Sequence, residues 1–348
     1  MQGTHIKTII IGAGPAGITC GYTLVKNEEE CLLIDRCTFP REKLCGGGLT
    51  PRALRLIDRI YEGLKYDYCQ VNTVDLYKSV NKICTFRLDT GIRTVARKDF
   101  DHTLLKEYLA KGGRFITDIV SKIEEKNGII HLTLASGKML TCNYLIGADG
   151  TNSIVRKYIQ PQFDRGIICL EKTVAGDNPI KDIRVYFDDA YPKGYLYIFP
   201  NPWGYVVGYG NGNTDIDIFH ESLERYGLTN DNKTKGAYIP TFCKFDYPFY
   251  KHIMLIGDAG GYVDSMTGEG IPHAIKSGEN AALSIINDTD FRELNKPVFD
   301  VVKRRMKMCL IFFYPPINKL FLYICKRPSL FIKINRKVNQ ALTGRYMI

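Results

Sequence analysis

A glycine-rich hexapeptide near the start of the chain sets the strongest limit on how the sequence can fold. The segment Gly12-Ala13-Gly14-Pro15-Ala16-Gly17 follows an apolar run, residues 6–11, and precedes a helix-like stretch that reaches about residue 26. Glycines at these spacings permit a tight strand-to-helix turn and let the backbone approach a pyrophosphate at the helix N-terminus. We therefore expect a βαβ unit with dinucleotide contacts at Gly12, Gly14, Ala16 and Gly17.

An acidic residue at the end of the next apolar run supports this expectation. Asp35 closes the segment CLLID, residues 31–35, and lies 18 positions after Gly17. A carboxylate at this place in a βαβ unit accepts a hydrogen bond from a ribose hydroxyl. These residues alone do not identify the nucleotide, because both FAD and NAD are compatible with them. A glycine-rich turn of another α/β fold is also compatible.

Two later motifs carry a resemblance that distinguishes FAD from NAD. The segment YLIGADGTNSIVR, residues 144–156, ends a strand in Ala-Asp-Gly, and IMLIGDAGGYVDSMTGEGI, residues 253–271, joins a strand to a helix through Gly-Asp and further glycines. In this order the three motifs resemble the FAD-binding proteins of the para-hydroxybenzoate hydroxylase class. The resemblance implies that Asp258 binds the ribitol and that Gly270 and Ile271 lie at the flavin ring. The positive end of that helix would favour an anionic reduced flavin.

The same resemblance extends to two further cofactor positions. Arg97, in ARKDFDHTLL, matches an arginine that precedes a Phe-Asp-x-x-Leu helix and usually contacts the phosphate or ribitol region. A surface arginine at the start of a helix is the alternative for this position. Val120 matches a position on the adenine side.

A cysteine followed by three glycines narrows the resemblance to one family. The segment PREKLCGGGL, residues 40–49, resembles the Pro-x-x-x-x-Cys-Gly-Gly-Gly stretch of the geranylgeranyl reductase family. The segment from Tyr195 to Pro200, followed by Gly208 and Gly210, matches that family's Tyr-x-Trp-x-Phe-Pro signature with a tyrosine at position 197. The resemblance covers about residues 5–290. It implies that Gly46 and Gly48 lie against the flavin and that Cys45 faces the flavin ring or the substrate.

The resemblance also implies a reaction, the saturation of C=C bonds in prenyl chains of a lipid or an isoprenoid quinone. An isolated alkene is a weak electrophile, so hydride transfer needs a positioned acid and a dry pocket. Cys45, Tyr195 and Tyr197 are the candidate proton donors or pocket-shaping residues; packing beside a turn and plain sheet core are the alternatives. We interpret His273 as a hydrogen-bonded structural histidine rather than a donor.

Two other functions fit the same motifs. Tyr195 to Pro200 loosely resembles the Trp-x-Trp-x-Ile-Pro stretch of flavin halogenases, so a flavin-dependent monooxygenase or halogenase acting on an aromatic substrate is one alternative. A non-catalytic flavin-binding protein is the other. For a reductase we expect NAD(P)H or a ferredoxin as a transient electron donor.

The order of the expected elements predicts an α/β fold with a C-terminal helical segment. We expect a Rossmann-type FAD-binding domain formed by residues 1–70, 97–165 and 245–290. An antiparallel-sheet substrate domain, residues 71–96 and 166–244, interleaves with it. Residues 291–348 form the helical tail.

The tail is basic, whereas the rest of the chain is close to neutral. Eleven of the 47 Lys and Arg residues follow residue 300, and none of the 37 Asp and Glu residues does. Because the apolar segment 308–325 lies among these cations, the tail suits an interface with anionic lipid. Packing of its apolar face on the flavin domain is the alternative, and both can hold; no other feature supports nucleic-acid binding.

Cysteine usage and hydropathy bear on the location of the protein. The eleven cysteines are scattered, without a CxxC pair or metal-type spacing, so we expect reduced thiols and no metal. We expect no signal peptide and no membrane-spanning helix. These features indicate a cytoplasmic protein, with a peripheral position at the inner face of the membrane as a further expectation.

Overall fold

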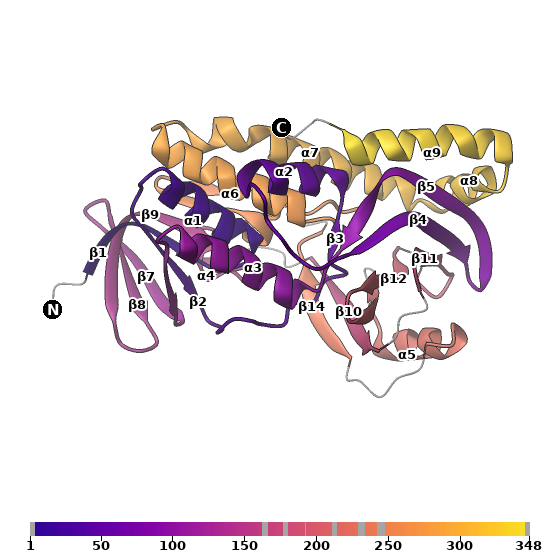
Figure 1. Cartoon of the computed structure of the whole chain (residues 1–348), viewed down its shortest axis with the longest axis horizontal. Coiled ribbons are helices and arrows are strands. Elements are labelled where there is room, and N and C mark those ends of the chain that lie inside the picture. The colour runs from indigo at the N-terminus through magenta and orange to yellow at the C-terminus, as the bar shows by residue number, and fades with distance from the viewer. Residues whose placement is uncertain are drawn as a thin grey trace.

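The computed structural model describes residues 4–161, 166–176, 180–191, 193–210, 214–228, 234–241 and 248–344. Two eight-stranded sheets and the helices around them make up this part of the chain. The first sheet lies towards the N-terminal end of the elongated molecule and the second towards the other end (Figure 1).

The first sheet is mainly parallel and has the strand order β15-β16-β9-β1-β2-β6. Strand β1 pairs in parallel with β2 and β9, and an antiparallel extension formed by β7 and β8 continues from β9. The strands are β1 (Thr4–Ile11), β2 (Cys31–Asp35), β6 (Arg114–Thr117), β7 (Val120–Lys126), β8 (Ile129–Leu134), β9 (Met139–Gly147), β15 (Phe249–Tyr250) and β16 (Ile253–Leu255).

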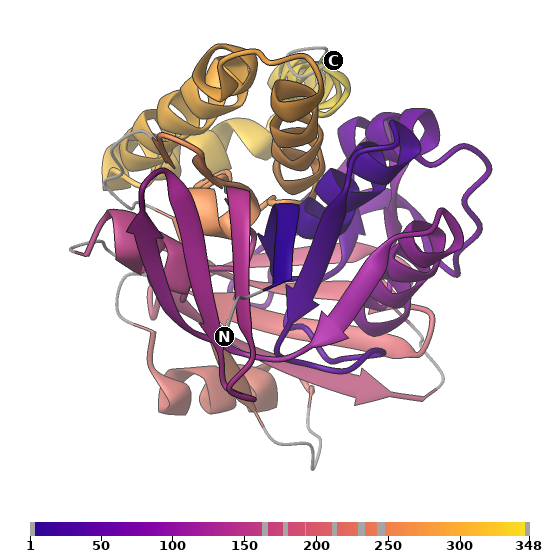
Figure 2. The ribbon, with the colours of Figure 1, turned by 90° about the vertical axis from the view of Figure 1, so that its left-hand side faces the viewer.

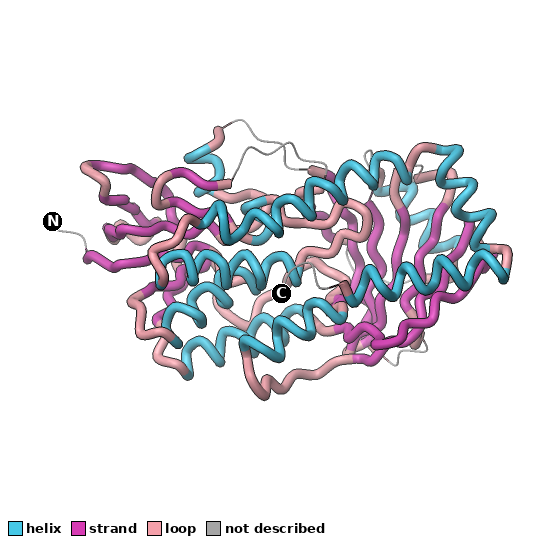
Figure 3. Tube along the Cα trace, turned by 90° about the horizontal axis from the view of Figure 1, so that it is seen from above, coloured by secondary structure: helices cyan, strands magenta, loops and turns pink. Residues whose placement is uncertain are grey.

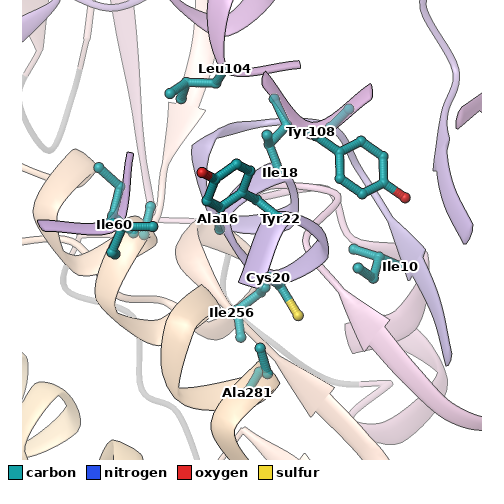
Figure 4. Packing of buried hydrophobic residues seen from close by; sticks show 14 of the residues in the cluster. Ile10, Ala16, Ile18, Cys20, Tyr22, Ile60, Leu104, Tyr108, Ile256 and Ala281 are labelled. Atoms are coloured by element: carbon teal, nitrogen blue, oxygen red, sulfur yellow. The ribbon is translucent and has the colours of Figure 1, made fainter. Parts of the chain in front are cut away.

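Helices cover one face of this sheet, and the β7–β8 extension helps to cover the other. The helices α1 (Pro15–Lys26), α2 (Pro51–Ile60), α3 (Arg97–Ala110) and α6 (Ile271–Ile286) contribute to one core, which receives Ile10 from β1 (Figures 2 and 4). Ile9 and Ile11 enter a second core on the opposite face, together with Val155 of α4 (Ile154–Ile159). Burial on both faces explains the continuous apolar run of β1.

The second sheet is mostly antiparallel, in the order β14-β10-β13-β12-β11-β4-β5-β3; β11 and β4 are parallel. On β12 the side chains alternate. Leu196 and Ile198 pack in a core with Phe219 of α5 (Ile216–Arg225). The residues that alternate with them, Tyr195, Tyr197 and Phe199, are half-buried. The strands are β3 (Gly48–Leu49), β4 (Cys69–Lys78), β5 (Asn81–Thr94), β10 (Ile167–Ala175), β11 (Ile183–Phe187), β12 (Tyr195–Asn201), β13 (Gly204–Gly210) and β14 (Lys235–Ile239).

Three C-terminal helices, α7 (Phe291–Phe312), α8 (Pro315–Cys325) and α9 (Pro328–Thr343), run along the molecule (Figure 3). Leu322 of α8 is buried with Phe86 of β5, and Phe331 of α9 packs against the same cluster. The Asn339 side chain accepts a hydrogen bond from the backbone of Asp89 at 3.0 Å and donates one to the backbone of Arg87 at 2.9 Å. The tail therefore has an inner face that packs on the second sheet.

No single helix of the described ranges has the length and hydropathy to cross a membrane. Helices α7 and α8 reach this length and hydropathy only when they are taken together, and the two helices are bent by 86° relative to each other.

The expected fold class is confirmed. Helix α7 begins at Phe291 and contains Pro297. Asp290 caps the helix by accepting a hydrogen bond from Arg292, so the helix starts before the proline. The domain division stays a prediction, and its boundaries at residues 165 and 244 lie outside the described residues.

Candidate active site

The turn between β1 and α1 requires glycine at two positions, Gly12 and Gly17. Gly12 has φ +104°, and a Cβ atom there would lie 2.3 Å from the carbonyl oxygen of Ala148. A Cβ on Gly17 would lie 1.9 Å from the carbonyl oxygen of Gly12. Gly14, at the start of α1, instead faces space, because within 4 Å its Cβ would meet only Arg41, at 3.8 Å. This open cradle at a helix N-terminus fits a pyrophosphate.

Ala16 is buried where α1 crosses the later motifs. A Cβ on Gly257 would lie 2.9 Å from the Cβ of Ala16, and a Cβ on Gly278 of α6 would lie 2.3 Å from the Ala16 carbonyl oxygen. Small residues therefore bring α1 and α6 together, so the starts of the first and third motifs belong to one site.

Asp35 shapes the same turn. Its carboxylate accepts hydrogen bonds from the backbone of Ala13 at 2.7 Å and of Cys37 at 2.9 Å. Arg41 donates to the carbonyl oxygen of Ala13 at 3.1 Å and lies 3.8 Å from the Asp35 carboxylate. Its Nε is buried without a hydrogen-bond partner among the described residues, which suits an anion at this position. The sequence analysis missed Arg41, although it stands within the PREKLC segment on which the family resemblance rests.

The three glycines after Cys45 pack against the second sheet. Gly47 has φ +70°, and its Cβ would lie 2.0 Å from the carbonyl oxygen of Val95. A Cβ on Gly46 or Gly48 would lie 3.1 or 3.0 Å from the ring of Phe199. The absence of side chains at these glycines thus lets the loop pack closely on the tyrosine-rich strand β12 and on the end of β5. Contact of this loop with the flavin stays a prediction.

The other end of the loop contacts the third motif. Lys43 lies 3.8 Å from the carboxylate of Asp258, in a 3-10 turn (Gly257–Gly260). Thr50 and Arg52 bind the buried carboxylate of Glu269, which directly precedes Gly270 at the start of α6. A Cβ on Gly270 would lie 3.5 Å from Oδ1 of Asp258. The fold therefore brings the cysteine–glycine loop, Asp258 and the N-terminus of α6, with buried Ile271, to one place.

Arg97 is buried rather than at the surface. As the first residue of α3, it donates two hydrogen bonds of 2.8 Å to Asp101, and its guanidinium also interacts with Cys45. Asp101 lies 3.7 Å from Arg41. Val120 lies elsewhere, in the core with Ile34, and its adenine contact stays a prediction.

Glu171 is a second site residue that the sequence analysis did not identify. It lies on β10, buried, and accepts hydrogen bonds from the backbone of Cys45 at 2.9 Å and from the hydroxyl of Tyr197 at 3.1 Å. Burial raises the pKa of its carboxyl to about 7, although the Cys45 amide and the Tyr197 hydroxyl act in the opposite direction. The available signal was a lone glutamate within an apolar strand, ICLEKTV.

The candidate tyrosines lie beside this carboxyl. Burial raises the pKa of both Tyr195 and Tyr197 above the ordinary tyrosine value. The hydroxyl of Tyr197 also lies 3.6 Å from the sulfur of Cys169, and the ring centroids of Tyr197 and Phe199 are 5.4 Å apart. The two tyrosines and Phe199 therefore give an aromatic wall next to the cysteine–glycine loop.

His273 of α6 departs from one expectation. It is fully buried, as a structural histidine would be, but neither ring nitrogen has a hydrogen-bond partner among the described residues. Burial lowers the pKa of the imidazole to about 4, so the ring is neutral. The described residues contain no cluster that could hold a metal ion.

Comparison with known proteins identifies the family of the chain. A family model of the FAD binding domain matches residues 5–166. An uncharacterized protein of Methanosarcina barkeri is 34% identical over 79% of this chain and 73% of its own length. The geranylgeranyl diphosphate reductase of Rhodobacter capsulatus is 27% identical, over 78% of this chain and 73% of that protein. The chain belongs to the geranylgeranyl reductase family of FAD-dependent oxidoreductases.

Further members and fold neighbours of this reductase family extend the comparison. The menaquinone reductase of Mycobacterium tuberculosis is 26% identical over 82% of this chain and 78% of its own. A geranylgeranyl bacteriochlorophyll reductase-like protein from Thermoplasma acidophilum superimposes with a TM-score of 0.72 at 18% identity, covering 99% of this chain and 93% of that one. A flavin-dependent brominase reaches 0.75 at 19% identity, with 99% and 95% coverage. These two structures share the fold alone.

Proposed function

We propose that this protein uses FAD to saturate C=C bonds of prenyl chains, in a geranylgeranyl lipid or an isoprenoid quinone. The observation that carries the proposal is the loop around Cys45, which contacts Asp258, Glu269 just before α6, and the pair of Glu171 and Tyr197. Cofactor elements and proton-bearing groups thus meet at one loop. The names of the Rhodobacter and Mycobacterium relatives support a prenyl or quinone substrate.

The residues of this chain would hold FAD along one line. The backbone at Gly12, Gly14 and Gly17, with Ala16 behind it, would bind the pyrophosphate, and Asp35 would bind the ribose. Asp258 would bind the ribitol, and the N-terminus of α6 at Gly270 and Ile271 would face the flavin ring. When bound and reduced, FAD supplies a hydride to one alkene carbon.

The aromatic side chains serve the substrate. Tyr195, Tyr197 and Phe199 form a half-buried wall that would pack against a prenyl chain and exclude water. Tyr197 would hold the proton for the second carbon at Oη, and Cys45 would shape the pocket beside it. The reductant that recharges the cofactor is NAD(P)H or a ferredoxin, and anaerobic stopped-flow bleaching of the flavin by each donor separates the two.

One experiment tests the function directly. The flavin-loaded protein is reduced anaerobically with dithionite and mixed with liposomes that contain a geranylgeranyl lipid or menaquinone, and the lipids are analysed by mass spectrometry. We expect a mass gain of two hydrogens for each bond reduced. Cys45→Ala should keep the flavin and lose turnover, whereas Cys69→Ala, another half-buried cysteine, should behave as wild type.

The second candidate function is a monooxygenase or halogenase, because the brominase shares the fold. No mass gain in the prenyl lipids, followed by oxygen or halogen insertion into an aromatic substrate when air is admitted, would establish that function instead. Retention of flavin without turnover under either condition would indicate a non-catalytic flavin-binding protein.

The C-terminal helices offer a route to a membrane-embedded substrate. These helices and the turns between them carry exposed apolar side chains, which we call the apolar outer face: Met308, Leu310, Ile311, Tyr314, Leu320, Tyr323, Leu330 and Ile332. The same segment also carries exposed cations: Lys307, Lys319, Lys326, Arg327 and Lys333. Exposed apolar side chains together with exposed cations favour docking on an anionic bilayer. The protein would thus bind the membrane peripherally, where prenyl lipids reside.

A further inference from the structure

We propose that Glu171 supplies the proton that Tyr197 delivers to the substrate alkene. This inference rests on the proposed function and adds a residue to it. Glu171 would not contact the substrate, so it is a positioning and proton-loading residue, and Tyr197 is the group that touches the reacting carbon.

Strand register places the two side chains in one row. On the second sheet, Glu171 of β10 lies opposite Gly208 of β13, which in turn lies opposite Tyr197 of β12. A side chain at the middle position would normally separate the outer two. A Cβ on Gly208 would lie only 1.9 Å from Cζ of Tyr197, so the tyrosine ring occupies the space that this glycine leaves free. The hydroxyl thereby reaches the carboxyl at 3.1 Å.

The contacts of Glu171 leave one oxygen for this role. Oε1 accepts the hydrogen bond from the Cys45 amide, and Oε2 faces the Tyr197 hydroxyl. Cys45 contacts the carboxyl through its backbone, while its sulfur accepts from the amide of Gly47 at 3.4 Å. Tyr197 is therefore the proton-bearing side chain in direct contact with Oε2.

The charged and titratable groups around Glu171 come from several elements. They are Lys43 and Cys45 of the loop, Arg97 of α3, Cys169 of β10, Tyr197 of β12, and Lys235, which lies opposite on β14. Although Lys43 and Arg97 favour the carboxylate, burial prevails and raises the pKa to about 7. A carboxyl of this kind carries a proton in a substantial fraction of molecules at neutral pH.

The proposed transfer moves two protons in one step, from Glu171 to Tyr197 and from Tyr197 to the alkene. When Glu171 is protonated on Oε2, the carboxyl donates its hydrogen bond to the Tyr197 oxygen. The hydroxyl hydrogen of Tyr197 can then turn towards the substrate. The Oη–H bond breaks as a C–H bond forms at the alkene carbon, and the carboxyl proton moves to Oη in the same step. The hydride and its electron pair come from reduced FAD, which is oxidised. Water then returns a proton to Glu171.

The pH dependence of a single turnover tests the relay. With pre-reduced protein and a prenyl lipid, the wild-type rate should fall tenfold per pH unit above about pH 7, because the protonated carboxyl disappears. Glu171→Gln should react about 100-fold more slowly and without this pH dependence. Asp75→Asn, which changes another buried carboxyl on β4, should keep the wild-type profile.

A second measurement does not depend on turnover. Infrared difference spectra between low and high pH, recorded with and without FAD, should contain a protonated-carboxyl band that disappears near pH 7. The band should persist in Tyr197→Phe and be absent from Glu171→Gln. Absence of that band in the wild type overturns the relay, as does an unchanged pH profile in Glu171→Gln while the lipid is still reduced. No lipid reduction by the wild type rejects the proposed function and the relay with it.

Discussion

The ring of Tyr197 lies directly over Gly208, on the neighbouring strand of the second sheet. This contact lets the tyrosine hydroxyl cross one full strand and bind the buried carboxyl of Glu171. The contact thus explains why a glycine occupies position 208 of the family signature in this chain. It provides the space in which the tyrosine at position 197 lies.

Replacing that glycine should disrupt the pair. Gly208→Ala places a methyl group 1.9 Å from Cζ of Tyr197, so the ring must leave its position and the hydrogen bond to Glu171 is lost. We expect loss of turnover with flavin retained, measured by lipid reduction and by the flavin absorbance of the purified protein. Gly210→Ala is the matched control, because its Cβ would meet Cys169 at an ordinary 3.4 Å. Equal effects of the two substitutions would contradict the role of Gly208.

The raised pKa of Glu171 predicts a pH-dependent stability. Its carboxyl titrates at 4.5 in the unfolded chain and at about 7 when folded, so the folded protein binds more protons between these values. Stability should therefore decrease as the pH rises from 4.5 to 7, by about 3 kcal/mol from this group. Urea unfolding of wild type and Glu171→Gln across this range should show that the variant lacks this decrease. Parallel curves for the two proteins would refute the shift.

The loop after Cys45 depends on Gly47 for two separate reasons. Gly47→Ala adds the strain of a positive φ, roughly 1–2 kcal/mol, and a clash 2.0 Å from the Val95 carbonyl oxygen. Gly63→Ala has a similar φ of +75° with nothing within 4 Å, so it isolates the strain. We expect Gly47→Ala to lower the free energy of unfolding clearly more than Gly63→Ala does. Similar losses would indicate that the loop can move away from Val95.

Asp258 should matter for the flavin. We expect Asp258→Ala to purify with much less FAD, because the ribitol loses its carboxylate partner and Lys43 loses its ion pair. The flavin-to-protein absorbance ratio measures this directly. Asp189→Ala, which removes an exposed carboxylate elsewhere, should keep full occupancy. Full occupancy in Asp258→Ala would remove this residue from the cofactor site.

The apolar outer face should control membrane binding. Leu310→Glu and Ile311→Glu introduce charge at side chains that are 61% and 59% exposed, so the fold should tolerate both. Sedimentation with anionic liposomes should fall strongly for each variant and decrease for wild type at high salt. Ile216→Glu changes an exposed isoleucine on α5 and should bind as wild type does. Unchanged sedimentation of the first two variants would argue against docking through this face.

Much of the fold could be predicted because its signals are local. Gly12 and Gly17 are required by contacts within one turn and its nearest strand, and the apolar run of β1 reports burial on both faces. The fold class and the family are confirmed. The residues of the catalytic and cofactor sites stay predictions, although the fold brings most of them to the loop around Cys45.

The sequence by itself determined the glycine turn, the apolar run of β1 and the family to which the chain belongs. Only the tertiary structure decided that Gly46 and Gly48 face Phe199, that Glu171 lies beneath Cys45, and that the basic tail also packs on the second sheet. Each of these contacts joins segments that are far apart in the chain. Their existence depends on strand register and on helix docking, which no local pattern of residues encodes.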